Sequence, residues 1–201
     1  MLNLRTGSWG RYLMCAVGAL LLVVPATASA SGVPTLSPNV STPLDDLLAP
    51  ESACPGETDL SAPRAAAAET MVCLHNYARA QSGLPPLHVD KELKASSLRK
   101  ARDIKHCQQF SHNACGRDAF YWVRKVGFLR GPAGAGENLA LGTGTVAEPR
   151  ETMQNWLNSP LHRSVLLTPS FDEVGISVVS GKVRGLSGTA AIWVAHFGYR
   201  H

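Results

Sequence analysis

The chain is predicted to be an α+β protein, because helical patterns come first and strand patterns fill its last third. Apolar residues recur at helical spacing over about 65–82 and again over about 90–107. Residues 174–179 and 190–197 are instead rich in β-branched and aromatic side chains, and the glycine-containing segment 181–188 separates them as a turn. Helices followed by an antiparallel hairpin indicate an α+β layer fold.

Local signals mark the ends of the two long helices. Gly83 follows the first apolar pattern and predicts the end of the first helix. Asp90 precedes the second pattern and is a typical N-cap residue, because its carboxylate accepts hydrogen bonds from free amides. The second helix is expected to end near 107–110, which places His112 just beyond a helix terminus.

The middle of the chain predicts shorter elements. Residues 118–126 indicate a short third helix, although its apolar residues do not all lie on one helical face. The glycine-rich residues 127–136 predict a loop that leads Glu137 into a short strand. Pro149 fits the first position of a fourth helix, which is expected to end at Asn158.

The first thirty residues have the features of a signal peptide. Arg5 and Arg11 make the start basic, residues 12–24 are apolar, and residues 28–30 form a small-residue cleavage site. The apolar stretch is too short for a comfortable membrane span. We therefore expect residues 1–30 to be removed and the mature protein to be secreted without a membrane span. Retention of this segment as an anchor is the alternative.

Charge and composition exclude some partners and indicate one domain. Removal of Arg5 and Arg11 lowers the net charge from +4 to +2, which does not favour nucleic acid as a partner. Residues 31–53 are rich in Ser, Thr and Pro and are typical of an extended tether. The remaining residues, 54–201, are long enough for one domain with a sizeable core.

Four cysteines remain after the expected cleavage, and in an exported chain they predict disulfides. Three pairings are open. The short separation between Cys107 and Cys115 favours a local bridge, which leaves Cys54 to pair with Cys73.

Five short motifs follow one another along the chain: Phe110-Ser111-His112, Gly136-Glu137-Asn138, Trp156-Leu157-Asn158-Ser159-Pro160-Leu161-His162-Arg163, Val174-Gly175-Ile176 and His196-Phe197-Gly198. In this order and at these intervals they resemble the secreted CAP domain, also called the SCP domain (cysteine-rich secretory, antigen 5, pathogenesis-related 1), in its bacterial branch. The resemblance covers about residues 54–198. It implies an α-β-α sandwich with a central antiparallel sheet.

The same resemblance implies that His112, Glu137 and His162 meet in one cleft. Two neutral imidazoles and a carboxylate suit a divalent metal ion, zinc above all, and an open coordination position would activate water for hydrolysis. In the alternative, structural interpretation, Glu137 accepts hydrogen bonds from buried donors and holds the fold together. Similar animal and plant proteins carry a second glutamate where this chain has Asn158-Ser159, so one metal ligand and one candidate base are missing.

We therefore expect a secreted binding protein rather than an enzyme. The expected ligand is a small apolar molecule such as a lipid, or a component of the cell envelope, held in the cleft. No cofactor is required, although weakly bound zinc fits the three residues. A metal-assisted hydrolase that uses His112 and His162 is the alternative function, since the family is united by its fold more than by one chemistry. His196 is expected to be a hydrogen-bonded residue of the core or its rim rather than a ligand.

Overall fold

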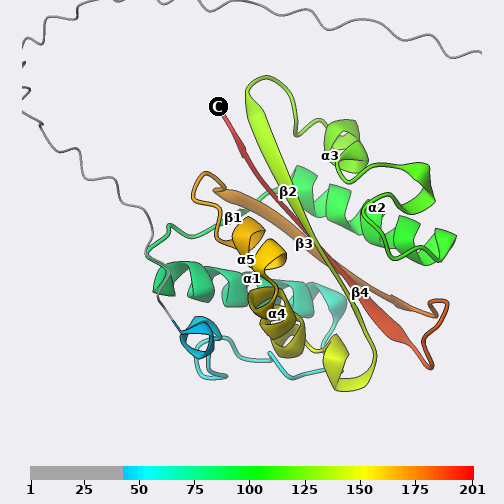
Figure 1. Cartoon of the computed structure of the whole chain (residues 1–201), viewed down its shortest axis with the longest axis horizontal. Coiled ribbons are helices and arrows are strands. Elements are labelled where there is room, and N and C mark those ends of the chain that lie inside the picture. Colours follow the sequence, from blue (N-terminus) through cyan, green and yellow to red (C-terminus); the bar gives the residue numbers. More distant parts are fainter. Residues whose placement is uncertain (1–42) are drawn as a thin grey trace, which may run out of the picture. The chain divides into compact units, whose positions relative to one another are not determined.

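A computed structural model describes residues 43–201, in which helices cover both faces of one sheet (Figure 1). One face carries α1 (Arg64–Gln81), α4 (Pro149–Asn158) and α5 (Pro160–Leu166), and the other carries α2 (Lys91–Cys107) and α3 (Tyr121–Val126). The strands are β1 (His88–Val89), β2 (Ala133–Gly142), β3 (Glu173–Gly181) and β4 (Ala190–Arg200). The expected signal peptide and the first part of the expected tether lie outside the described residues.

The sheet has the order β1-β3-β4-β2, and its three long strands are antiparallel. The α+β class, the sandwich and the β3–β4 hairpin are therefore confirmed. The edge strand β1 differs from the prediction, because it runs parallel to β3 and pairs only with Glu173 and Val174. The sheet is thus mixed at this edge.

The end of the glycine-rich segment before Glu137 is strand, so the prediction of a loop over 127–136 is wrong from Ala133 onward. β2 pairs with β4 from Ala133 to Gly142 without interruption. Its glycines serve close packing: a β-carbon at Gly134 would lie 2.5 Å from the Tyr199 ring, and one at Gly136 would lie 2.8 Å from Val165. Because glycine has no side chain, these residues lack the alternating apolar pattern that indicates a strand in the sequence.

The two long helices and α4 begin and end close to their predicted bounds. The Asp90 side chain accepts hydrogen bonds from the backbone amides of Glu92 and Leu93, both at 2.8 Å, as expected for an N-cap. α4 has the predicted bounds, whereas α5 was not predicted because Ser159-Pro160 follows a complete helix directly. Among the described residues, no helix combines the length and apolar character that a membrane span requires.

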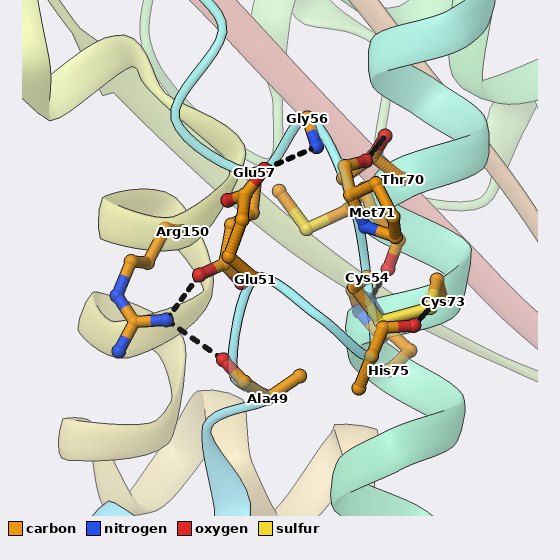
Figure 2. The surroundings of a disulfide bond; sticks show 12 residues. Ala49, Glu51, Cys54, Gly56, Glu57, Thr70, Met71, Cys73, His75 and Arg150 are labelled. Atoms are coloured by element: carbon orange, nitrogen blue, oxygen red, sulfur yellow. Dashed lines mark hydrogen bonds and ion pairs between the residues drawn. A yellow bond between two sulfur atoms is a disulfide. The ribbon is translucent and has the colours of Figure 1, made fainter.

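The described end of the expected tether is packed against the domain. Leu44–Leu47 form a 3₁₀ helix, and Leu47 and Ala49 are completely buried. Figure 2 shows how two links fasten this segment: the disulfide Cys54–Cys73 joins it to α1, and Arg150 of α4 binds Glu57 and the carbonyl of Ala49. Both predicted disulfides, Cys54–Cys73 and Cys107–Cys115, are confirmed.

A histidine lies within the main hydrophobic core. His75 of α1 is completely buried and contacts the rings of Trp156 and Phe197. Its Nδ1 lies 2.7 Å from the carbonyl oxygen of Met71, and its Nε2 has no hydrogen-bond partner among the described residues. Burial disfavours the charged imidazolium and lowers the pKa of His75 from 6.5 to about 4.

We predict that His75 makes the fold sensitive to acid. Between pH 6.5 and about pH 4 the unfolded chain binds a proton at this position and the folded chain does not. Stability should therefore fall by about 3 kcal/mol as the pH decreases through this window. Urea unfolding at several pH values should show a smaller decrease for His75→Leu than for the wild type. The exposed-residue control His106→Ala should keep the wild-type decrease, and an unchanged slope in His75→Leu would contradict the prediction.

Candidate functional site

The structure centres the predicted site on Glu137, whose side chain is 1 % exposed. Glu137 lies on β2 directly opposite His196 on β4. One carboxylate oxygen, Oε1, accepts a hydrogen bond from His112 Nδ1 at 2.6 Å, and Oε2 accepts one from His196 Nε2 at 2.9 Å. Both oxygens of the buried carboxylate are thus bonded to imidazoles.

Two side chains of helix α2, Ser96 and Lys100, contact the histidines and the carboxylate of this network. Ser96 Oγ lies 2.6 Å from His196 Nδ1 and 2.8 Å from the carbonyl oxygen of Leu93. Lys100 Nζ lies 3.9 Å from Glu137 Oε2 and donates a hydrogen bond to the backbone carbonyl of His112. The contacts fix both histidines around Glu137, and His196 is the hydrogen-bonded core residue that its sequence context predicted.

The charges of this network depend on one another. Burial by itself raises the pKa of Glu137, but the hydrogen bonds from His112 and His196 and the nearby Lys100 outweigh it, so the pKa lies below 4.5. Burial lowers the pKa of Lys100, and the attraction of Glu137 opposes that shift. Glu137 is therefore ionised at neutral pH and compensates a nearly buried ammonium group.

The two predicted histidines carry opposite pKa shifts. The hydrogen bond to Glu137 raises the pKa of His112, whose side chain is 55 % exposed. Burial, and then the charge of His112, lower the pKa of His162 on α5. Asn138, which follows Glu137 on β2, donates to the backbone carbonyl of His162 at 2.9 Å. The result is one imidazole that favours its protonated form beside one that favours its neutral form.

The geometry favours the structural role of Glu137 over the role of a metal ligand. Each of its oxygens already accepts a hydrogen bond, as in metal sites where a carboxylate orients a ligating histidine from behind. Within residues 43–201, no three His, Cys, Asp or Glu side chains form a group that could hold a metal ion. A metal at this position would rest on His112 and His162 alone, and zinc binding stays a prediction.

Sequence reasoning did not find all members of this network. Ser96, Lys100 and Asn138 were not predicted to belong to it. Asn138 lies in the Gly136-Glu137-Asn138 motif, of which only Glu137 was given a role. A signal for Lys100 was present, because it lies four residues after Ser96 and on the same side of α2 as the buried Ala101 and Ile104. A lysine in that position needs a partner charge, which the sequence alone does not identify.

The fold and this site define an α-β-α sandwich whose sheet buries a carboxylate between histidines. The family model for the cysteine-rich secretory protein family, CAP, matches residues 72–197. The chain belongs to this family. It is 32% identical over 151 residues to the Bacillus subtilis protein named "Uncharacterized protein YkwD", an alignment that covers 74% of this chain and 54% of that relative. The chain thus spans about half of the length of YkwD.

Solved structures of low sequence identity share the fold. An extracellular protein containing an SCP domain from Bacillus anthracis has a TM-score of 0.54 and 23% identity, over 67% of this chain and 40% of that one. An outer surface protein from Borrelia burgdorferi has a TM-score of 0.54 and 22% identity, over 66% of this chain and 92% of that one. These likenesses show a common fold.

We predict that Glu137 is required for stability and for the basicity of His112. Glu137→Ala leaves the buried His196 Nε2 without its acceptor and Lys100 without its opposite charge, and it should lower the free energy of unfolding by about 1–3 kcal/mol. Glu137→Gln keeps one acceptor oxygen and should lower it less. The pKa of His112, followed by NMR, should fall in Glu137→Ala because the hydrogen bond that raises it is lost. Equal and negligible effects of both variants would contradict the structural role of Glu137.

The Cys107–Cys115 bridge should hold the segment that carries His112. Replacing both cysteines with serine should lower the free energy of unfolding by at most about 2.5 kcal/mol, as chain entropy predicts for a short loop. Hydrogen exchange of the amides between the two positions should become faster. The matched double variant of Cys54 and Cys73 should leave those amides unchanged. Equal exchange in both double variants would contradict a local role for this bridge.

Proposed function

We propose that the protein is an exported binding protein that holds a cell-envelope component at His112 and His162 without chemical turnover. The observation that carries this proposal is the engagement of both oxygens of Glu137. A general base needs a lone pair that faces the substrate. The carboxylate of this site instead faces two imidazoles and a lysine, and its buried position suits a framework role.

The chemistry of the two histidines favours a polar ligand. The raised pKa of His112 makes it a hydrogen-bond donor that carries positive charge over a wider pH range. His162 has a lowered pKa and its Nδ1 is buried, so its neutral ring presents Nε2 to a ligand, as donor or acceptor according to the tautomer. Carboxylate, phosphate and sugar hydroxyl groups match this pair better than a wholly apolar molecule does. Of the two expected ligand classes, the envelope component is therefore the better match.

Two findings support export. Both disulfides join cysteines in the domain, and disulfides persist in oxidising compartments outside the cytosol. The relatives of known structure include proteins named as extracellular and as an outer surface protein. Export through a signal peptide at residues 1–30 fits both findings.

The proposal is tested by native mass spectrometry of the protein purified from its own host. Wild-type protein and the exposed-residue control His106→Ala should carry the same bound molecule. The double variant His112→Ala/His162→Ala should lose it while keeping the wild-type circular dichroism spectrum. A molecule that is retained by the double variant, or a product that appears during incubation with the wild type, would contradict binding without turnover at this site.

Zinc titration by calorimetry separates this function from the metal-dependent alternative. We expect weak binding that disappears in either single variant, His112→Ala or His162→Ala. Coordination requires neutral imidazole, and the pKa of His112 is raised, so affinity should begin to fall at a pH above the ordinary ~6.5. Stoichiometric zinc that survives dialysis would instead favour the metal-assisted hydrolase.

A further inference from the structure

The outer edge of β3 has no strand partner over most of its length within the described residues. β1 pairs with this edge only at Glu173 and Val174, and the chain then leaves the sheet to begin α2. From Gly175 to Gly181, β3 pairs with β4 on its inner side alone. An unpaired edge is a ready template for another strand.

The pairing with β1 shows which backbone groups face outward. The amide of Asp90 donates to the carbonyl of Val174 at 2.9 Å, so Val174 presents its polar groups to the outer side. The register with β4 is regular, and outward and inward residues alternate along a strand. Ile176 and Val178 therefore also point their N–H and C=O groups outward, where no described residue bonds to them.

These groups border a hollow of about 380 Å³ between α1 and α2, which we call the edge hollow. Its α1 wall includes Ala65 and Ala68, whose small side chains leave room, and its α2 wall includes Leu98. Ile176 and Val178 are, as whole residues, only 2 % and 7 % exposed, and helices lie over both faces of the sheet (Figure 1). Both residues line the edge hollow, which is therefore the side from which a partner would approach their backbone groups.

The rim of the edge hollow is strongly basic. Arg64, Lys94, Arg102 and Lys105 line it, and no acidic side chain is among the lining residues. None of the four forms an ion pair with a described residue. Lys105 closes the far end of the edge by donating to the carbonyl of Ser180 at 2.9 Å. The rim therefore attracts an anionic partner.

We propose that the edge hollow binds an extended acidic peptide segment, which adds to β3 as a further strand. The main chain of the peptide pairs with the outward groups of Ile176 and Val178, as in recognition by β-strand addition. Its acidic side chains meet the four basic residues of the rim. The added strand continues the line along which β1 pairs with β3. This site is separate from the proposed function of His112 and His162.

An acyl chain is a poorer match for the edge hollow than a peptide. It would cover the N–H and C=O groups of Ile176 and Val178 without bonding to them, and burying polar groups without partners is unfavourable. A peptide supplies a donor and an acceptor at the same spacing as the strand. The unpaired backbone groups, rather than the basic rim alone, decide between these two occupants.

The test uses an acetylated and amidated peptide of about six residues, a usual strand length, with alternating glutamate and valine. We expect NMR titration of the purified protein to show saturable binding and slower hydrogen exchange of the Ile176 and Val178 amides. The charge reversal Arg102→Glu should weaken binding about tenfold, as expected when like charges replace opposite ones. Lys125→Glu on α3 makes the same charge change outside the hollow and should leave the affinity unchanged.

Two control peptides separate strand addition from simple charge attraction. The same peptide with lysine in place of glutamate should not bind. A peptide with the same acidic residues but proline at alternate positions should not bind either, because proline lacks the N–H that a strand ladder requires. The proposal is overturned if the proline peptide binds equally well or if the Ile176 and Val178 amides exchange as before. Displacement of the peptide by dodecanoate with the same dependence on Arg102 would assign the hollow to an anionic amphiphile and overturn it too.

Discussion

The buried carboxylate of Glu137 is the constraint on which the rest of the site depends. A carboxylate that is almost wholly removed from water is tolerated only if its charge and its oxygens have partners. The partners come from three other parts of the chain: His196 from β4, Lys100 from α2 and His112 from the segment after α2. The charge of one residue therefore holds the sheet, a helix and a loop in one arrangement.

Close packing of α2 on the sheet makes this network geometrically feasible. A β-carbon at Gly175 would lie 2.0 Å from backbone atoms of Leu93 and Lys94, so no residue with a side chain fits there without displacing the helix. The helix is further tied to β3 by a hydrogen bond of 2.8 Å between the hydroxyls of Ser97 and Ser177. Because the helix lies so close, the short side chain of Ser96 reaches His196. The glycine in the Val174-Gly175-Ile176 motif thus has a packing role that supports the site.

The protein offers two surfaces with different chemistry. At the proposed site, His112 and His162 are two imidazoles of opposite pKa shift beside the buried Glu137 network, and the proposed ligand there is polar. Along β3, backbone groups that no described residue pairs with lie beside a basic rim, and the proposed ligand there is an extended peptide with acidic side chains. Membership in the CAP family accounts for the scaffold. The chemistry of each surface depends on its own residues, because one fold hosts many functions.

The sequence by itself determined the fold class, the helix that Asp90 caps, the bounds of α4 and the β3–β4 hairpin, since these depend on residues close together in the chain. The motif order was also sufficient to single out His112, Glu137 and His162. Only the tertiary structure decided what Glu137 does, because its partner His196 lies 59 positions away and meets it through strand register. The role of Lys100 and the unpaired edge of β3 were likewise decided by packing between distant segments. Local patterns carry no information about which remote group satisfies a buried charge.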